Sequence, residues 1–425
     1  MISSGGQTET GDDPAALARA LEPAIRVRKD GVTLLEAIRD TCQGRLSEIE
    51  WFRATWQRGG AATGFAKWRN GSGDVPVIVK IPVGYNELSW TVQLGDHGLD
   101  RDVVNVPHPT PRVLSSGTEL GGHDLAWLVI ERLEGKPVAG DLSERSLNGL
   151  LRAAVEFQAR AERERGAFGK PPETPDWEKA LDDSRQWVRD NHIENASRWK
   201  KAIQGVQKLL PRLVSKWEVR EINAWCHGDL HPGNVIHMPA EEGHPDRCVL
   251  IDLALTHAGH WVEDAVYLEH LFWGHDEKLF GVKPVKQMRR LRKERGLRVG
   301  EDDSVLADIK RLLIASTTPS FLKVGGDTLH AHGALVVAEG LVKPWSSAGQ
   351  WESRRSGQSR IREERSSMES FEKLKQMVVM VEDDMAKAEG GNKAAGTRAR
   401  KQLQDIRNAA QEIRKEILTL RDQTD

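Results

Sequence analysis

The stretch that decides the fold is residues 225–252, which read W-C-H-G-D-L-H-P-G-N-V-I-H-M-P-A-E-E-G-H-P-D-R-C-V-L-I-D. Strands are predicted over Val235–Met238 and Cys248–Ile251, because both segments are apolar and a polar turn separates them. A hairpin of this kind returns Asp252 to the side of Asn234. The stretch therefore predicts two polar side chains held together at the base of a short antiparallel pair.

Three side chains here have the oxygen chemistry that phosphoryl transfer requires. Asp229 lies in the loop before the hairpin, and Asn234 follows at the far end of that loop. Oxygen ligands from Asn234 and Asp252 suit a hard cation such as Mg²⁺ that also carries nucleotide phosphates. Asp229, one loop away, can accept the proton of an attacking hydroxyl. The plain alternative is an ordinary hairpin with a polar loop.

The pattern H-G-D-x-x-x-x-N followed by I-D resembles the aminoglycoside phosphotransferase and choline kinase family, the small-molecule relatives of protein kinases. The resemblance implies a bilobal α+β fold with an antiparallel-sheet N-lobe and a mainly helical C-lobe, and the use of ATP with Mg²⁺. It implies that Asp229 is the catalytic base and that Asn234 and Asp252 hold the metal. It also implies that His227 braces the loop and that Asp264, in E-D-A, ties a helix start to it.

Residues 47–133 have the pattern of a kinase N-lobe. Three strands are predicted first, at Ile49–Trp56, Phe65–Trp68 and Val75–Ile81. Gly59 and Gly60 lie between the first two strands, and glycines let backbone amides approach phosphates closely. They are therefore candidates for nucleotide binding, with a flexible hairpin tip as the alternative. The other common phosphate loop, G-x-x-x-x-G-K-[ST], is absent from the sequence.

Lys80, late in the third strand, resembles the lysine that binds the nucleotide phosphates in this family. Its partner glutamate should follow on the next helix, where Glu87 is the candidate and Asn86 is a candidate cap. Glu87 comes only seven positions after Lys80, fewer than the family usually has. The alternative is that Glu87 is a first-turn glutamate favoured by the helix dipole.

Two further strands are expected to complete the sheet, at Pro107–Leu114 and Leu125–Leu133. The second resembles the hinge of the family, so backbone groups from Glu131 to Leu133 are candidates for reading the adenine. When backbone groups bind the base, the side chains at these positions do not reveal which base it is. The sequence therefore does not distinguish ATP from GTP as the phosphoryl donor.

The composition limits the other classes of function. The chain has 425 residues, a formal net charge of -2, and 29% charged residues, so the molecule as a whole is no polycation. Three cysteines without a C-x-x-C pattern argue against a disulfide framework and for a reducing compartment. No apolar run has the length of a signal peptide core or a membrane span. These features predict a cytoplasmic protein.

Residues 134–345 are expected to form the C-lobe. Helices are predicted near Ser146–Arg163, Trp177–His192 and Ala196–Trp217, with three more between 276 and 345. The segment between Asp252 and Asp264 is short, no A-P-E follows it, and Gly228 stands where a protein kinase normally has arginine. These features favour a small acceptor over a protein substrate.

Several polar groups of the C-lobe have two interpretations each. The acidic side chains of Glu178, Asp182 and Asp183 attract a cationic acceptor or belong to a solvated helix face. The basic stretch at Lys283–Arg298 meets an anionic partner or is likewise solvated. Histidines also suggest zinc, although their spacings fit no standard ligand set, and they are His227, His231, His237, His244, His257 and His260.

The tail, residues 368–425, follows a serine-rich linker at 346–367. Its apolar residues repeat at intervals of three and four on both sides of Gly390-Gly391-Asn392, which predicts a helical hairpin with a coiled-coil seam. The segment G-N-K-A-A-G-T-R-A-R-K resembles the short bacterial linker-histone-like proteins, and this resemblance implies DNA binding. Eight basic and three acidic side chains between 391 and 421 support only weak, salt-sensitive binding. Self-association through the hairpin is the alternative.

Two hypotheses of different classes follow. In the first, the chain is an ATP- and Mg²⁺-dependent phosphotransferase that acts on a hydroxyl of a small molecule. In the second, a kinase-like domain senses a nucleotide or metabolite, and the tail attaches it to DNA or to a second copy. The sequence does not identify the acceptor, because a fold implies a reaction class and not a substrate.

Overall fold

A computed structural model describes residues 34–52, 61–71, 73–95, 109–191, 193–240, 246–322 and 326–346, with a few positions between 381 and 410. The chain divides into two compact units, Met1–Val342 and Lys343–Asp425. Within the described residues, none of the helices combines the length and apolar character that crossing a membrane requires.

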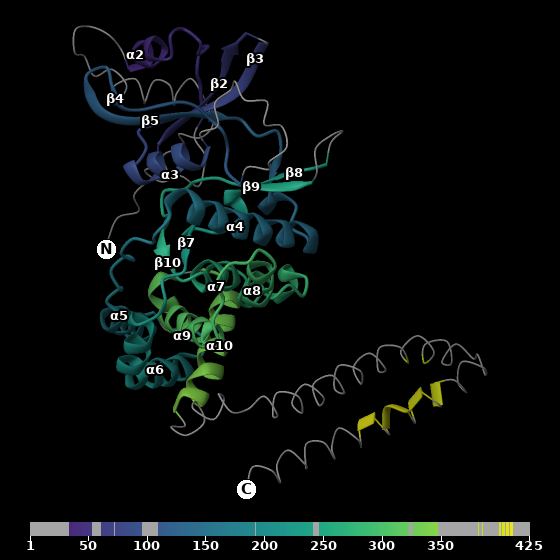
Figure 1. Ribbon diagram of the computed structural model, residues 1–425. Helices are drawn as coiled ribbons and strands as arrows, with labels where there is room; N and C mark the ends of the chain where they lie inside the picture. Colours follow the sequence, from purple (N-terminus) through teal and green to yellow (C-terminus); the bar gives the residue numbers. More distant parts are fainter. Residues whose placement is uncertain are drawn as a thin grey trace, which may run out of the picture. The chain divides into compact units, whose positions relative to one another are not determined.

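The N-lobe of the first unit is built on an antiparallel sheet in the order β1-β2-β3-β5-β4 (Figure 1). Its strands are β1 (Glu50–Phe52), β2 (Ala62–Asn70), β3 (Gly73–Ile81), β4 (Val113–Leu120) and β5 (His123–Glu131). The helix α2 (Leu34–Thr41) covers one face of the sheet and α3 (Tyr85–Gly95) covers the other.

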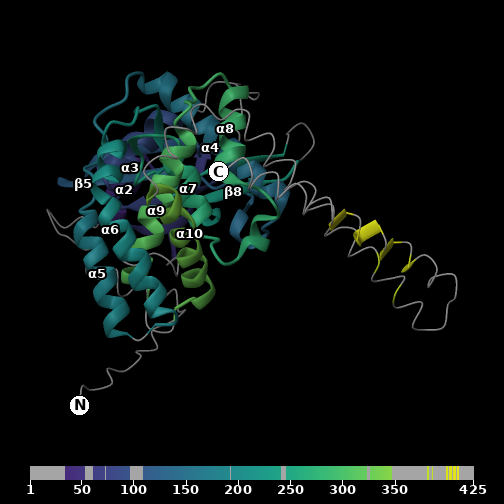
Figure 2. The same cartoon turned by 90° about the horizontal axis from the view of Figure 1, so that it is seen from below.

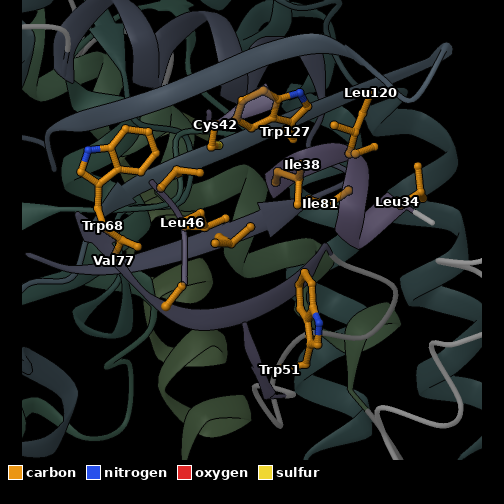
Figure 3. Close-up of a cluster of buried hydrophobic side chains, with 14 residues drawn as sticks. Leu34, Ile38, Cys42, Leu46, Trp51, Trp68, Val77, Ile81, Leu120 and Trp127 are labelled. Atoms are coloured by element: carbon orange, nitrogen blue, oxygen red, sulfur yellow. The ribbon is translucent and has the colours of Figure 1, made fainter. Parts of the chain in front are cut away.

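Strand alternation explains how this sheet has two cores. Trp127 and Val129 of β5 point to the face under α2, where a cluster of fourteen buried residues lies (Figure 3). Leu128 and Ile130 point to the opposite face and pack with Leu88 of α3. Successive side chains of a strand point to opposite faces, so a continuous apolar run such as L-A-W-L-V-I is what a sheet covered on both faces needs.

The C-lobe is mainly helical. Its helices are α4 (Glu144–Arg165), α5 (Trp177–Asp190), α6 (Ala196–Glu218), α7 (Val262–His270), α8 (Pro284–Glu294), α9 (Asp303–Phe321) and α10 (Thr328–Ser346). Its short strands are β6 (Lys136–Pro137), β7 (Ala224–Cys226), β8 (Val235–Met238), β9 (Arg247–Leu250) and β10 (His257–Gly259), and its 3₁₀ turns are Val138–Gly140, Pro232–Asn234 and Asp276–Leu279. Figures 1 and 2 show α5, α6 and α9 side by side.

The expected bilobal α+β architecture is confirmed, and the three C-lobe helices predicted first are found close to their expected ends. The fourth strand is a correction, because β4 runs over Val113–Leu120 and not over Pro107–Leu114. Pro109 and Pro111 have no N–H to donate to a ladder, so the strand begins only after them. The predicted strand at Cys248–Ile251 lies one residue earlier, at Arg247–Leu250.

Parts of the predicted organisation lie outside the described residues. These are residues 1–33 of the N-terminal lead and helices predicted over 1–46, the glycines at 59 and 60, residues 241–245 of the hairpin turn, and residues 347–367 of the linker. In the second unit, the described positions between 381 and 410 are helical, and Val381 and Ala399 are buried. The coiled-coil seam and the lobe and linker boundaries stay predictions.

Candidate active site

The stretch 225–252 folds as a strand, a polar loop and a hairpin beneath the N-lobe (Figure 1). In the hairpin, Val235 pairs with Leu250, and the amide of Ile251 donates to the carbonyl oxygen of Asn234 at 2.9 Å. This register places Asp252 one residue beyond the pair, beside Asn234. The predicted return of the chain at Asp252 to the side of Asn234 is therefore present in the backbone.

Asp229 lies at the centre of the site with both carboxylate oxygens engaged. The side-chain amide of Asn234 donates to its Oδ2 at 3.0 Å and to its backbone oxygen at 3.1 Å. The hydroxyl of Tyr267 donates to Oδ1 at 2.5 Å, and His231 Nε2 lies 3.6 Å from Oδ2. The side chain is still 28% exposed, so a substrate can reach it.

His227 braces the loop from a fully buried position. Its Nε2 donates to the carbonyl oxygen of Ile251 at 3.0 Å, and its Nδ1 accepts from the amide of Asp229 at 3.3 Å. A carbonyl can only accept and an amide can only donate, so this geometry selects one neutral tautomer. Burial lowers the pKa of His227 despite the carboxylate of Asp264 nearby, which agrees with a neutral ring.

Asp264 fixes the same loop from the start of α7. Its carboxylate is buried and accepts from the amides of His227 and Gly228, both at 3.0 Å, and from Nε2 of Gln158 at 3.1 Å. Buried carboxylates persist when hydrogen bonds replace their hydration. The structure thus brings both residues expected to support the loop into direct contact with it.

Gly228 stands at its position for a geometric reason. Its φ is +82°, a region that favours glycine. A Cβ there would come within 2.2 Å of the carbonyl oxygen of Leu255. An arginine after the loop histidine, as in protein kinases, does not fit this backbone.

The residues predicted to hold Mg²⁺ fit a hard cation. In the described part of the chain, Oδ1 of Asn234 and the carboxylate of Asp252 make no hydrogen bond or ion pair within the protein. Oxygen donors of this kind are the ligands that Mg²⁺ prefers. Asp252 also has a φ of +63°, uncommon outside glycine, and such conformations gather at functional sites.

Lys80 and Glu87 form an ion pair despite their short separation in sequence. Lys80 lies on the sheet face that α3 covers, because Val79 and Ile81 point the other way. Only residues 82–84 connect β3 to α3, so the first turn of that helix comes back over Lys80. Both side chains are largely buried, at 12% and 9% exposure.

Asn86 has a different role from the cap considered for it. Its side-chain amide donates to the carbonyl oxygens of Ala254 and Thr256, at 2.8 and 3.0 Å. These carbonyls belong to the segment that follows Asp252. Asn86 therefore joins the N-lobe helix to the loop of the predicted metal ligand, a contact across 168 residues that no local pattern reveals.

The predicted adenine hinge lies at the end of β5. The amide of Glu131 donates to the carbonyl oxygen of Arg112 at 2.9 Å, and the amide of Arg132 donates to that of Pro76 at 3.0 Å. These two amides are thus used within the sheet. Contacts to adenine would fall to the Glu131 carbonyl and the Leu133 amide, and this role stays a prediction.

Several acidic and basic groups of the C-lobe surface have partners within the protein. Gln207 donates to Asp182 at 2.8 Å, and Lys179 lies 2.5 Å from Asp183 on the exposed face of α5. In the basic stretch, four arginines contact carboxylates, in the pairs Arg289–Asp303, Arg290–Glu294, Arg295–Glu156 and Arg298–Glu221. Both patterns favour the solvated-face interpretation.

Arg292 is the exception in this stretch, because it is fully buried. Its guanidinium donates to Oε1 of Gln158 at 2.5 Å and to the carbonyl oxygens of Asn223 and Arg298, at 3.0 and 2.9 Å. Burial lowers the pKa of Arg292 to about 10, so it stays charged at neutral pH. Gln158 also contacts Asp264, and a buried network therefore runs from α8 to the catalytic loop.

The histidines do not assemble a zinc site in the described part of the chain. Among the described residues, one group of three possible metal ligands occurs. It consists of Cys226, His257 and Glu263, whose ligand atoms lie within 4.8 Å of one another. Glu263 is already paired with Arg220 at 3.2 Å and Lys310 at 3.6 Å. Burial raises the pKa of the Cys226 thiol well above its usual range. These features oppose a metal–thiolate bond.

Tyr267 is the site residue that sequence patterns did not identify. It follows Asp264 by three positions on α7, so both side chains project from one side of the helix. Asp264 holds the backbone of the loop and Tyr267 reaches the carboxylate of Asp229. The spacing from Asp264 is the signal that could have revealed it.

An antiparallel N-lobe with a buried lysine–glutamate pair, over a loop with this aspartate, asparagine and second aspartate, defines a kinase-like phosphotransferase. The family model described as the phosphotransferase enzyme family matches residues 65–287, more than half of the 425 residues. The chain belongs to this family. Residues 368–423 match the family model of the histone H1-like protein Hc1. No curated protein matches the chain.

Solved structures with the same kind of fold include a microcompartment-associated aminopropanol kinase, at 17% identity over 74% of this chain and 98% of that one, with a TM-score of 0.45. An aminoglycoside-3'-phosphotransferase of type VIII has 22% identity over 66% and 98%, with a TM-score of 0.37. An aminoglycoside phosphotransferase from Alicyclobacillus acidocaldarius has 14% identity over 71% and 93%, with a TM-score of 0.43. Likeness at this level says nothing about the acceptor.

Proposed function

We propose that this chain transfers the γ-phosphoryl group of ATP to a hydroxyl group of a small molecule. The observation that carries the proposal is the arrangement of Asp229, Asn234 and Asp252 on one loop and hairpin. It supplies a partly exposed carboxylate beside oxygens of Asn234 and Asp252 that have no protein partner among the described residues. The family match agrees with this reaction class, and the ion pair of Lys80 with Glu87 offers a cation for the phosphates.

In the proposed reaction, the acceptor hydroxyl gives its proton to Asp229 as its oxygen attacks the γ-phosphorus. The new O–P bond forms, the bond from phosphorus to the bridging oxygen breaks, and ADP leaves. Lys80, held by Glu87, binds the phosphates of the nucleotide. Mg²⁺ bound by Asn234 and Asp252 would neutralise phosphate charge. Most of the acceleration then comes from positioning and electrostatics.

The acceptor is proposed to be small. Only eleven residues separate Asp252 from Asp264, and Asn86 holds the carbonyls of Ala254 and Thr256 against α3. This leaves no long segment of the kind on which a protein kinase docks a peptide. Aminoglycosides, aminoalcohols, sugars and amino-acid alcohols are the classes to compare.

The test is Mg²⁺-dependent ADP release from ATP with a panel of amino sugars, aminoalcohols, neutral sugars and nucleosides. We expect one class to raise ADP release in the parent protein and not in the Asp229→Ala variant. Phosphate transfer to the acceptor should be confirmed by mass. A panel that stays silent while ATP still binds would favour the nucleotide-sensing hypothesis.

A second candidate function belongs to the tail, and the match of residues 368–423 to Hc1 is the observation that favours it. We propose that the tail binds DNA weakly through its basic second half. A protein ending near Ser367 should keep full ADP release and lose retention on DNA. In the full chain, the affinity for DNA should decrease as the salt concentration rises. The decrease should be steep between about 50 and 200 mM, because phosphate contacts release counterions.

A variant with Arg398, Arg400 and Lys401 changed to glutamine separates charge from the hairpin itself. If it binds DNA as well as the parent protein, the electrostatic explanation is wrong. If the parent shows no DNA retention and forms an oligomer that the shortened protein does not form, the tail is an assembly element.

A further inference from the structure

Tyr267 is a half-buried donor placed directly on the proposed base. Its hydroxyl gives Oδ1 of Asp229 a hydrogen bond of 2.5 Å, while the amide of Asn234 gives Oδ2 one of 3.0 Å. We infer that Tyr267 is a positioning residue for the phosphotransfer reaction, which fixes the orientation of the Asp229 carboxylate toward the acceptor hydroxyl. This inference rests on the proposed function of Asp229.

The two donors act on a side chain that is otherwise free to turn. The terminal torsion of an aspartate is broad, and the side chain of Asp229 is 28% exposed. Donors on both oxygens fix the plane of the carboxylate. Each oxygen keeps a lone pair, because a carboxylate has about four acceptor sites. The acceptor hydroxyl can therefore bind without displacing Tyr267.

The surroundings of Tyr267 keep it in place as a donor. It lies on α7, the helix that Asp264 ties to the catalytic loop. His270 Nδ1 donates to the Tyr267 carbonyl oxygen at 2.5 Å, and the His270 ring lies against the phenol with centroids 5.0 Å apart. Burial and then the hydrogen bond to Asp229 raise the pKa of Tyr267, so the phenol keeps its proton at neutral pH.

The chain contains a matched control for this contact. Tyr85 is the only other tyrosine in the sequence, and its hydroxyl also donates to an aspartate, Asp124. Tyr85 is 55% exposed on the N-lobe, and within the described residues its hydroxyl makes no hydrogen bond to the catalytic loop. Phenylalanine at either position removes one hydroxyl of the same chemistry.

We expect Tyr267→Phe to lower kcat by about 10-fold, since a hydrogen bond to a charged group is lost, with acceptor and ATP KM values unchanged within about twofold. Tyr85→Phe should match the parent protein. Turnover is measured with the acceptor found in the panel, or with water as acceptor where the panel gives none. A Tyr267→Phe protein that matches Tyr85→Phe overturns the inference, and so does one that changes only KM.

A titration without turnover tests the contact itself. In a Tyr85→Phe protein labelled with 3-fluorotyrosine, Tyr267 gives the only tyrosine ¹⁹F signal, and the fluorinated phenol ionises at a lower pH than tyrosine. Asp229→Asn removes the charge beside the phenol and should move its titration to lower pH. An unmoved titration means that the hydrogen bond is absent and refutes the inference.

The proposed roles of Asp229 and Tyr267 are refuted by different results. If Asp229→Ala keeps the parent turnover, Asp229 is not the base and its proposed role is wrong, whatever the titration shows. If Asp229→Ala loses turnover and Tyr267→Phe does not, only the positioning role is refuted. Circular dichroism and thermal unfolding of each variant show whether a loss of kcat comes from a loss of fold.

Discussion

Replacing Asp229 by alanine is expected to lower turnover by about 10²- to 10⁴-fold while ATP still binds. The reason is that the variant loses the group that accepts the proton of the acceptor hydroxyl. The ion pair of Lys80 with Glu87 lies on the N-lobe and does not depend on this carboxylate. ADP release under saturating substrates measures the first effect, and calorimetric titration with ATP measures the second.

The control for this experiment is Asp124→Ala, which removes an aspartate that also accepts from a tyrosine hydroxyl but lies on the N-lobe surface. It should keep the turnover of the parent protein. Asp229→Asn adds a second comparison, because the amide retains the shape but accepts protons poorly. Parent-like turnover in both Asp229 variants would mean that another group takes the proton.

The loop and hairpin were predictable because their information is local. Asp229 and Asn234 are five residues apart, and the register of a short hairpin carries Asp252 back to Asn234. Sequence spacing alone does not decide whether Lys80 and Glu87 form an ion pair. It does not show that a connection of three residues between β3 and α3 is long enough to bring Glu87 back to Lys80. Strand alternation decides the matter, because it places Lys80 on the face that α3 covers.

The contacts that link distant segments were not predictable. Asn86 reaches Ala254 across 168 residues, and Arg292 reaches Gln158 across 134. Periodicity indicates which face of a helix is buried, but it does not name the partner of a buried polar group. In a basic helix such as α8, the one buried arginine looks like its solvated neighbours. Tyr267 differs, because its spacing of three from Asp264 is a local signal that could have revealed it.

The acceptor stays a matter for experiment for the same reason. No sequence motif marks the residues that would bind the acceptor. The charged groups of α5 considered for a cationic acceptor are paired or exposed on its surface, as with Lys179 and Asp183. The reaction class follows from three side chains of suitable chemistry on one loop and hairpin, whereas the substrate does not follow from the fold.

Asp264→Asn is expected to lower the free energy of unfolding by about 2 to 4 kcal/mol, because it leaves a buried donor unsatisfied. The carboxylate accepts three N–H groups, from His227, Gly228 and Gln158. An amide offers one oxygen and turns an N–H₂ group toward at least one of those donors. Turnover should also decrease, even at temperatures well below that of unfolding. The reason is that Gly228, which Asp264 holds, directly precedes Asp229 in the loop.

Chemical denaturation and ADP release at a temperature where the variant is folded measure the two effects separately. Asp183→Asn is the matched control, since Asp183 is exposed and, among the described residues, pairs only with Lys179 on α5; it should change stability by no more than about 0.5 kcal/mol. If Asp264→Asn is as stable and as active as this control, the hydrogen bonds of Asp264 do not hold the catalytic loop. A stable but inactive variant would instead show that Asp264 acts on loop geometry more than on the fold.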